Sequence, residues 1–419
     1  MKAVVLAAGE GVRLRPLTLT RPKHLLPVGG KPLIVRLLES LKSVGIREAV
    51  LVTYYKADML KNYLKSGESL GMSLEYVSQR GVLGTADAVL RAEEHVRGEP
   101  FLVVYGDLLV SPEAVRRVVE DFRKGGASAS MAVVEVERPW SYGVVSLEEG
   151  RVKAIVEKPP KGREPSNLAN AGVYVFSEDV FRFLKKTGKS VRGEYELTDT
   201  ITAMVEDGLE VRAVEVDPED WMDVGYPWSL LEANERVLKN LEAKILGEVE
   251  EGAVIKGPVY VGEGARVRSG AYVEGPVYIG PGADVGPNCY IRRYTSLGAR
   301  VRVGNACEIK NSIVMDGTHI AHLSYVGDSV IGERCNFGAG TLIANLRFDD
   351  RPVRVMVKDR LVDSGRRKLG VIMGDEVKTG VNVSIMPGVK VGPRSWIAAG
   401  LTVYRDVPPD TFLREGQKI

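Results

Sequence analysis

The chain has 419 residues, with 57 Lys and Arg against 55 Asp and Glu, so no net charge draws it as a whole to nucleic acid or to an acidic membrane. No apolar run reaches the roughly 18 residues that a membrane span needs. The three cysteines lie far apart without C-x-x-C spacing, so neither a disulfide framework nor a zinc ribbon is indicated. We expect a soluble cytoplasmic protein of two or three domains, without nucleic-acid or membrane partners.

The first part of the chain, residues 1–229, alternates apolar runs with helical patterns. AVVLAAG, AVLVTYY and FLVVYGD are typical of buried strands, and LIVRLLESLKSVG has the spacing of a helix. Strands that alternate with helices predict an α/β domain with a Rossmann-like, mostly parallel sheet. Ligands of such sheets bind at the carboxyl ends of the strands.

A glycine-rich turn follows the first predicted strand. Gly9 and Gly11 lie in this turn, where backbone N–H groups can approach a phosphate, and Arg13 and Lys23 add positive charge nearby. The segment has neither the GK[ST] of a Walker A loop nor a dinucleotide fingerprint. The turn and its cations predict phosphate binding, whereas the glycines alone would also fit a purely structural turn.

Two carboxylates end apolar segments of this part. Asp107 follows FLVVYG and Asp223 follows WM, so both lie where strands are expected to end. Carboxylates in such positions can hold a hard cation such as Mg²⁺, which keeps waters and bridges substrate phosphates. Either residue alone is more often a turn or a helix cap, so the predicted magnesium site depends on the pair.

The second part of the chain begins with a predicted helix and continues with a six-residue hydrophobic repeat. We predict a linker helix at 230–248, because SLLEANERVLKNLEAKIL has apolar positions at helical spacing without Gly or Pro. In residues 249–419, apolar residues recur every sixth position, and small or β-branched residues precede them by two. This pattern predicts a left-handed parallel β-helix of hexapeptide repeats. The two columns are Val261, Val267, Val273, Ile279, Val285, Ile291, Leu297, Val303 and Ile309, and Ala265, Ala271, Val277, Ala283, Cys289, Thr295, Val301 and Cys307.

The repeat is interrupted at about residues 345–370 and resumes at Met373. The interrupting segment must leave the β-helix as a loop, and it carries eight Lys and Arg against four Asp. It could be an ordinary solvated loop or a clamp for an anion. Cys289 and Cys307 are interpreted as small core side chains on one face.

Seven segments in order give residues 1–229 a resemblance to the sugar-1-phosphate nucleotidylyltransferases: LAAGEGVRLRPLT, RPKHLLPVGGKP, QRGVLGTADAV, VYGD, VEKP, NAGVYVF and WMDVGYPW. One departure is Val12, where the family commonly has Thr or Ser. The resemblance implies that Mg²⁺ assists the coupling of a sugar 1-phosphate to UTP or dTTP. Implied roles are triphosphate neutralisation for Arg13 and Lys23, nucleotide contact for Gly9 and Gly11, base recognition for Gln79, Gly84 and Thr85, Mg²⁺ binding for Asp107 and Asp223, and sugar-phosphate binding for Gly143, Glu157, Lys158 and Asn170. Without the resemblance, Glu157 and Lys158 would be interpreted as a surface ion pair and Asn170 as a turn residue.

A second resemblance covers residues 249–345 and, more loosely, the final coils. RRYTSLG, EIKNS, AHLSYVGD and IGERCNFGAGTLIAN resemble the acetyltransferase half of the bifunctional N-acetylglucosamine-1-phosphate uridyltransferase/glucosamine-1-phosphate acetyltransferases. It implies that His322 takes a proton from the sugar amine as the amine attacks acetyl-CoA, a role that suits imidazole. Other implied contacts are Arg292 and Lys310 with phosphate, Tyr325, Asn336 and Asn345 with the sugar phosphate or the acetyl group, Arg351 in place of a family lysine, and Ala399 along the pantetheine arm.

His322 has two other interpretations. A metal ligand is one, but no Cys or carboxylate pattern near His319 and His322 completes a metal site. A hydrogen-bonded coil residue is the other. His319 has no assigned role.

Three hypotheses for function remain open at this stage. The leading one is a two-site enzyme that acetylates a hexosamine 1-phosphate and transfers a nucleotide to a sugar 1-phosphate, acting as a homotrimer. A second keeps nucleotidyl transfer alone, with a structural or regulatory β-helix. A third is a protein scaffold, as in some exchange-factor subunits of translation initiation, and the presence of Arg13, Lys23, Asp107 and Asp223 argues against it.

Overall fold

The computed structural model describes residues 1–416, and the contacts within the chain divide it into two compact units. The first unit comprises Met1–Glu10 and Leu33–Asp223, and the second comprises Gly11–Pro32 together with the chain from Val224 onward. Residues 11–32, which include Gly11, Arg13 and Lys23, therefore group with the C-terminal half, whereas Gly9 belongs to the first unit. Among the described residues, no helix is long and apolar enough to cross a membrane.

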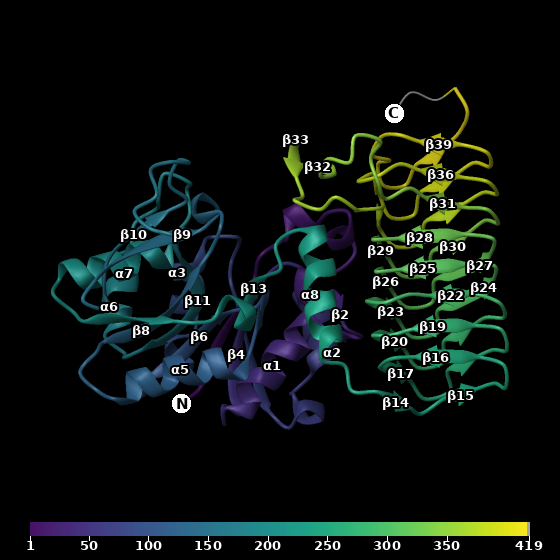
Figure 1. Cartoon of the computed structure of the whole chain (residues 1–419). Helices are drawn as coiled ribbons and strands as arrows, with labels where there is room; N and C mark the ends of the chain where they lie inside the picture. The colour runs from purple at the N-terminus through teal and green to yellow at the C-terminus, as the bar shows by residue number, and fades with distance from the viewer. Residues whose placement is uncertain (417–419) are drawn as a thin grey trace. The chain divides into compact units, whose positions relative to one another are not determined.

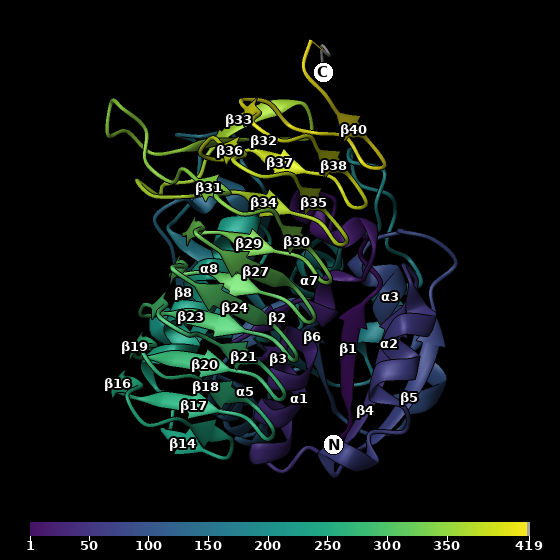
Figure 2. The same cartoon turned by 90° about the vertical axis from the view of Figure 1, so that its right-hand side faces the viewer.

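The first unit is built on a nine-stranded sheet whose order places the N-terminal strand β1 inside it. The strands in spatial order are β5 (Ser73–Ser78), β4 (Glu48–Thr53), β1 (Ala3–Ala7), β6 (Phe101–Tyr105), β11 (Leu168–Phe176), β8 (Ala129–Glu135), β12 (Val211–Glu215), β10 (Arg151–Glu157) and β9 (Gly143–Glu148). Figure 2 shows β1, β4 and β5 side by side. All five residues of β1 are buried, as its unbroken apolar run predicts.

The sheet is parallel in its first half and mixed in its second. β5, β4, β1 and β6 run parallel, which confirms the prediction from alternating strands and helices. β11 instead runs antiparallel to β6 and β8, and β9 and β10 form an antiparallel pair. The short connection between β9 and β10 explains why those two strands are antiparallel, because a few residues can reverse a strand but cannot cross over to a parallel neighbour.

The helices form two groups, α1 with α5 and α3 with α6 and α7, and both groups contact the sheet (Figure 1). Local sequence sets where they begin. Ser111 Oγ accepts a hydrogen bond from Ala114 N at the start of α5, and Pro112 occupies its first turn. The helices of this unit are α1 (Leu33–Ser43), α2 (Ala57–Leu64), α3 (Thr85–Arg91), α4 (Glu93–Val96), α5 (Pro112–Arg123), α6 (Val180–Leu184) and α7 (Leu197–Glu206).

The C-terminal part of the second unit is a parallel β-helix with three faces (Figure 1). Face 1 consists of β14 (Lys244–Ile245), β17 (Val259–Val261), β20 (Val277–Ile279), β23 (Thr295–Leu297), β26 (Ile313–Val314), β29 (Val330–Ile331), β34 (Ile372–Met373) and β37 (Lys390–Val391). Face 2 consists of β15 (Glu248–Val249), β18 (Arg266–Val267), β21 (Asp284–Val285), β24 (Arg302–Asn305), β27 (His319–His322), β30 (Asn336–Phe337), β35 (Lys378–Thr379), β38 (Trp396–Ile397) and β40 (Phe412–Leu413). Face 3 consists of β16 (Val254–Lys256), β19 (Tyr272–Glu274), β22 (Tyr290–Ile291), β25 (Glu308–Lys310), β28 (Tyr325–Gly327), β31 (Leu342–Ile343), β36 (Ser384–Ile385) and β39 (Thr402–Val403).

The core of the β-helix contains both predicted columns, which confirms the hexapeptide interpretation. Cys289, Cys307 and Cys335 are free and buried, and burial raises the pKa of the Cys289 thiol to about 12. The six-residue spacing is not strict beyond Ile309. It shortens to five at Val314 and again at Ile331, because the corner between faces 3 and 1 has one residue fewer in these coils.

The linker helix and the insert differ from their predicted forms. Helix α8 spans Pro227–Lys239 and ends earlier than expected, since β14 already begins the β-helix at Lys244. The insert leaves the β-helix at the corner between faces 3 and 1, but it contains an antiparallel hairpin instead of loop alone. The hairpin pairs β32 (Arg354–Val357) with β33 (Arg360–Asp363).

Candidate functional site

The two predicted metal carboxylates lie on paired strands of the first unit. Asp107 follows β6 and directly precedes β7 (Leu108–Val110), and Asp223 ends β13 (Trp221–Asp223), where it lies opposite Leu108. The antiparallel ladder therefore brings the backbones of Asp107 and Asp223 together. No group of three or more His, Cys, Asp or Glu side chains within residues 1–416 could hold a metal. A donor set of two carboxylates, without His or Cys, is chemically suited to Mg²⁺ rather than to a transition metal.

The predicted sugar-phosphate residues gather on β9, β10 and β11 of the same unit. Gly143 and Glu157 are register partners, and a Cβ on Gly143 would lie 2.9 Å from Glu157 Oε2. A side chain at residue 143 would therefore displace that carboxylate from its present position. Glu157 Oε1 pairs with Lys158 Nζ at 3.1 Å and accepts a hydrogen bond from Arg192 Nη1 at 2.9 Å. The motif residues therefore form a small charged cluster rather than isolated surface groups.

Asn170 is buried in β11 with its amide oxygen fixed. Asn170 Oδ1 accepts hydrogen bonds from Gly172 N at 3.1 Å and from the Tyr174 hydroxyl at 2.7 Å. This leaves the amide nitrogen of Asn170 as a donor. The next carbonyl, that of Ala171, accepts a hydrogen bond from Trp221 Nε1 at 2.7 Å, so the strand that carries Asp223 is attached beside Asn170.

Asp87, which the sequence did not single out, bonds one of the predicted base-binding residues, Gln79. Gln79 is buried, and its Nε2 donates to the carbonyl of Gly84 and to Asp87 Oδ2, both at 3.0 Å. Both amide hydrogens are thereby used, and the carbonyl oxygen is what Gln79 presents. Thr85 Oγ1 accepts a hydrogen bond from Leu197 N, so its hydroxyl fixes α7. Asp87 lies within the GTADAV segment and gave no separate signal.

Two further acids were missed near Glu157. Burial raises the pKa of Glu196, although Arg192 opposes the shift, and burial followed by the charge of Glu157 raises the pKa of Asp199. Raised carboxyl pKa values mark sites where desolvation and like charges are concentrated. The charged run RGEYELTD was the only signal for these acids in the sequence.

The two cations of the glycine-rich segment, Arg13 and Lys23, have different local surroundings. Gly9 follows β1 in the first unit, whereas Gly11, Arg13 and Lys23 belong to the second. The Gly11 carbonyl accepts a hydrogen bond from Thr18 Oγ1 at 2.9 Å. Arg13 lies over the ring of Tyr226, 4.7 Å from its centroid. Lys23 starts a short 3₁₀ helix.

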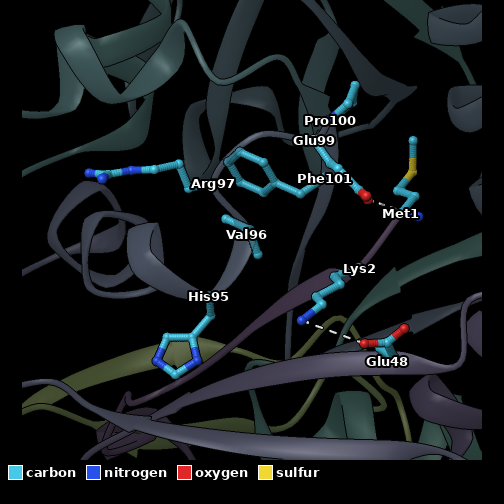
Figure 3. Close-up of a pocket in the computed structure, with 9 residues that line it drawn as sticks. All are labelled: Met1, Lys2, Glu48, His95, Val96, Arg97, Glu99, Pro100 and Phe101. Atoms are coloured by element: carbon cyan, nitrogen blue, oxygen red, sulfur yellow. Dashed lines mark ion pairs between the residues drawn. The ribbon is translucent and has the colours of Figure 1, made fainter.

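The first unit also has a hollow of about 280 Å³, which none of the predicted site residues lines (Figure 3). Its lining includes Met1, His95 and Phe101, and ion pairs join Lys2 to Glu48 and the N-terminus to Glu99. These residues stand at the amino ends of β1 and β6. Ligands of open α/β sheets bind at carboxyl ends, where Asp107 lies, so this hollow is not the candidate site.

In the β-helix, a polar cluster surrounds the buried carboxylate of Asp328 at the corner between faces 3 and 1. The Asp328 side chain is 3% exposed, and it accepts hydrogen bonds from Lys310 Nζ at 3.1 Å and Asn345 Nδ2 at 2.6 Å through Oδ2. Asn311 Nδ2 donates to Asp328 Oδ1 at 3.0 Å. Two predicted substrate residues, Lys310 and Asn345, thus share one acceptor. Asp328 escaped notice because the corner turns that carry Asn311 and Asp328 break the six-residue spacing.

Tyr325, on face 3, bonds a member of this cluster. Asn345 Nδ2 donates to the Tyr325 hydroxyl at 3.1 Å, and burial raises the pKa of that phenol. His322 ends β27 three residues before Tyr325, at the corner between faces 2 and 3. Its ring is exposed and has no hydrogen-bond partner within residues 1–416. Face 3 therefore lies between an accessible imidazole and a set of fixed donors.

The corner that holds His322 continues along the β-helix to Ala399. Backbone hydrogen bonds join Gly340 N to the His322 carbonyl, Asn382 N to the Ala339 carbonyl, and Gly400 N to the Val381 carbonyl. These bonds stack His322, Ala339, Val381 and Ala399 at one corner of successive coils. A row of residues parallel to the axis of the β-helix therefore runs from His322 to Ala399.

The remaining predicted residues occupy separate places. Arg292 Nη1 pairs with Glu308 Oε1 at 2.8 Å on face 3, below Tyr325. Asn336 is exposed on face 2, opposite His319 and Lys378. Arg351 is exposed in the insert, where its N–H bonds Asp349.

Arg366, rather than Arg351, is the insert residue that approaches the cluster around Asp328. Its guanidinium lies 3.9 Å from Asp328 Oδ1 and donates to Glu235 Oε1 of α8 at 2.7 Å. At least this part of the basic insert has a structural partner within the protein.

Comparisons with known proteins cover both halves of the chain. Residues 2–240 match the model of the nucleotidyl transferase family, and residues 273–394 match that of the GMPPB C-terminal domain. The bifunctional protein GlmU of Methanocaldococcus jannaschii is 44% identical over 99% of this chain and 97% of its own length. The bifunctional sugar-1-phosphate nucleotidylyltransferase/acetyltransferase of Sulfurisphaera tokodaii is 43% identical over 99% of this chain and 100% of its own length.

The chain belongs to the bifunctional sugar-1-phosphate nucleotidylyltransferase/acetyltransferase family. A solved UDP-glucose pyrophosphorylase complexed with UDP-glucose has a TM-score of 0.52 and 30% identity, and the match covers 57% of this chain and 98% of that one. The sequence-based family assignment is thereby confirmed, and so is the enzyme class. The individual residue roles stay predictions.

Proposed function

We propose that this member of the family acetylates glucosamine 1-phosphate with acetyl-CoA and couples a sugar 1-phosphate, N-acetylglucosamine 1-phosphate or glucose 1-phosphate, to UTP or dTTP. The acetyl-transfer half is supported by the residues along face 3. The accessible imidazole of His322 lies at one edge of this face, the Tyr325 phenol lies on it, and the donors around Asp328 lie at its other edge. A merely structural β-helix has no need of such a surface.

For acetyl transfer, His322 takes a proton from the amine nitrogen while that nitrogen attacks the acetyl carbonyl carbon. The carbon–sulfur bond then breaks, and the CoA thiolate leaves. Lys310 and Arg292 supply positive charge for the sugar phosphate, and the row from His322 to Ala399 accommodates the pantetheine arm. General-base assistance of this kind contributes about 10²–10⁴-fold to rate.

For nucleotidyl transfer, the phosphate oxygen of the sugar attacks the α-phosphorus in line, and pyrophosphate leaves. Such a step depends on positioning and charge neutralisation rather than on a protein nucleophile. Arg13 and Lys23 neutralise the triphosphate. Asp107 and Asp223 would hold Mg²⁺, which when bound offsets the charge that develops on the phosphates.

Recognition of the base follows from the fixed orientation of Gln79. Its carbonyl oxygen is the presented atom, since Gly84 and Asp87 take both amide hydrogens. That acceptor complements an imino N–H, which uracil and thymine both carry. We therefore expect selection of either pyrimidine against cytosine, whose corresponding ring nitrogen has no hydrogen.

Paired initial-rate assays test the proposed function. CoA thiol release from acetyl-CoA with glucosamine 1-phosphate should be measured beside pyrophosphate release from UTP with N-acetylglucosamine 1-phosphate. We expect both. Pyrophosphate release without acetyl transfer to glucosamine or galactosamine 1-phosphate would instead support an enzyme whose β-helix is structural.

We further propose a homotrimer in which acetyl-CoA lies between subunits. Exposed Leu323 and Val381 at the corner beside His322, with Leu342 on face 3, are apolar groups that association would bury. Light scattering under assay conditions should give three times the chain mass, and a monomer would contradict the proposal. The cytoplasmic location stays a prediction.

The hydrogen bonds to Asp328 lead us to expect that this residue contributes to the thermal stability of the protein. Replacing Asp328 with Ala removes the acceptor of Lys310 and leaves that ammonium, 20% exposed, without its partner. Breaking a buried pair by removal of one side costs about 3 kcal/mol. Scanning calorimetry should therefore show a clearly lower unfolding midpoint for Asp328→Ala.

The matched control for Asp328→Ala is Asp349→Ala, because Asp349 pairs with Arg347 on the surface of the insert. Exposed ion pairs contribute little to stability because water screens them, so the unfolding midpoint of Asp349→Ala should stay near that of the wild type. Equal midpoints for the two variants would show that the Asp328 cluster does not stabilise the β-helix.

A further inference from the structure

The segment that carries Arg13 and Lys23 is attached to the β-helix through a buried arginine. The Arg21 side chain is 9% exposed, and its Nη2 donates to Asp375 Oδ2 at 2.6 Å while Nη1 bonds Glu333 Oε1. Asp375 is 5% exposed, and its other oxygen accepts a hydrogen bond from Glu333 N at 2.8 Å. Both carboxylates lie at the corner between faces 1 and 2, in neighbouring coils.

Two further contacts hold the end of the same segment. Gly29 N donates at 2.9 Å to Asn234 Oδ1, and this fully buried side chain of α8 also bonds the Tyr294 carbonyl and Ser296 Oγ of the β-helix. Gly30 lies against Tyr278, since a Cβ at Gly30 would overlap the Tyr278 ring. The segment is thus fixed at residue 21 and again at residues 29 and 30, and Lys23 lies between these points.

The chemistry of the Arg21 attachment favours positioning over simple adhesion. Taking a guanidinium and a carboxylate out of water costs free energy that their attraction only partly offsets. Apolar contacts at the same place would therefore hold the segment at least as firmly as this ion pair. A planar guanidinium bonded to two fixed carboxylates instead specifies direction. Lys23 follows two residues later, so the orientation of Arg21 limits where that ammonium can lie.

We propose that Arg21, Glu333 and Asp375 are positioning residues for nucleotidyl transfer, so that the β-helix itself sets the place of the triphosphate-binding cations. This inference rests on the proposed roles of Arg13 and Lys23. The β-helix then contributes to both reactions through different corners: the corner with His322 serves acetyl transfer, and the corner with Glu333 supports nucleotidyl transfer.

The test uses the full chain with Glu333→Gln, Arg21→Lys and the double variant. Glu333 is 26% exposed and lies more than 300 residues from Arg21 in sequence, so Glu333→Gln weakens the attachment without burying an unpaired charge there. Misplacement of catalytic groups by about 1 Å can cost about 100-fold. We expect nucleotidyl transfer to lose about tenfold or more in kcat/KM, with acetyl transfer by the same preparation unchanged.

Two readouts separate positioning from general damage. The double variant should lose about as much nucleotidyl transfer as Arg21→Lys alone, because Arg21→Lys already alters the contact that Glu333→Gln weakens. Amide hydrogen exchange of peptides within residues 11–32 should become faster in each variant, whereas peptides of the β-helix core should not change. This second readout does not depend on activity.

The control is Asp410→Asn, which removes a carboxylate from the exposed pair of Arg394 and Asp410 in the same β-helix. It should leave both activities and the exchange of residues 11–32 as in the wild type. Wild-type nucleotidyl kinetics and unchanged exchange in Glu333→Gln and Arg21→Lys would overturn the inference. A wild-type protein without nucleotidyl transfer would instead overturn the proposed function, and the exchange measurement would still decide whether the attachment holds the segment.

Discussion

His322→Ala is expected to abolish acetyl transfer to glucosamine 1-phosphate while UTP-dependent pyrophosphate release continues at the wild-type rate. The ring of His322 is accessible at the corner beside face 3, and its removal leaves no base for the proton of the attacking amine. Loss of general-base assistance lowers rate by about 10²–10⁴-fold. Thiol release and pyrophosphate release should be measured on one preparation of the variant.

His319 provides the matched control. It lies on the same strand, β27, three residues earlier, and is exposed like His322. His319→Ala should keep acetyl transfer close to the wild-type rate. Equal losses in both variants would mean that the strand, and not the imidazole of His322, is what the reaction needs. Full acetyl transfer in His322→Ala would make His322 a structural residue.

Asp107→Ala should have the opposite pattern, with nucleotidyl transfer lost and acetyl transfer retained. The ladder of β7 and β13 brings Asp107 beside Asp223, and the pair forms the carboxylate part of the proposed magnesium site. Metal stabilisation of developing phosphate charge amounts to several kcal/mol, and each 1.4 kcal/mol is about tenfold in rate. Pyrophosphate release should therefore fall by at least about 100-fold.

Asp207→Ala is the control for Asp107→Ala, because Asp207 is an exposed carboxylate of the same unit that pairs with Arg182. It should leave pyrophosphate release unchanged. If Asp107→Ala also had no effect on pyrophosphate release, the proposed metal site would be wrong. Loss of that activity in Asp107→Ala alone would exclude a protein that serves only as a scaffold.

Periodic burial was readable from the sequence. The columns headed by Val261 and Ala265 and the apolar run of β1 each depend on neighbours close in the chain or on a fixed repeat, so a pattern could predict them. Asp107 and Asp223 were also expected where strand-like segments end, and the ladder of β7 and β13 sets Asp223 opposite Leu108, the residue after Asp107. Their joint part in metal binding stays a prediction.

Contacts between distant residues could not be read in this way. Arg21 lies in a segment that looks like part of the first domain, and nothing near it indicates two carboxylates more than 300 residues away. The role of Asp328 likewise depends on Lys310 and Asn345, which donate hydrogen bonds to it only once the coils of the β-helix form. The five-residue spacing at these corners also hides the position of Asp328 in the six-residue repeat. Such polar clusters depend on the three-dimensional path of the chain rather than on a local period.

The most direct measurement of the central claim is a single reaction that contains the wild-type protein, glucosamine 1-phosphate, acetyl-CoA, UTP and Mg²⁺. Mass spectrometry should detect the UDP-linked N-acetylated hexosamine, and its formation should require both acetyl-CoA and UTP. That product would establish that one chain performs both steps. Formation of a nucleotide sugar only when N-acetylglucosamine 1-phosphate is supplied ready-made, with no thiol released from acetyl-CoA, would contradict the account.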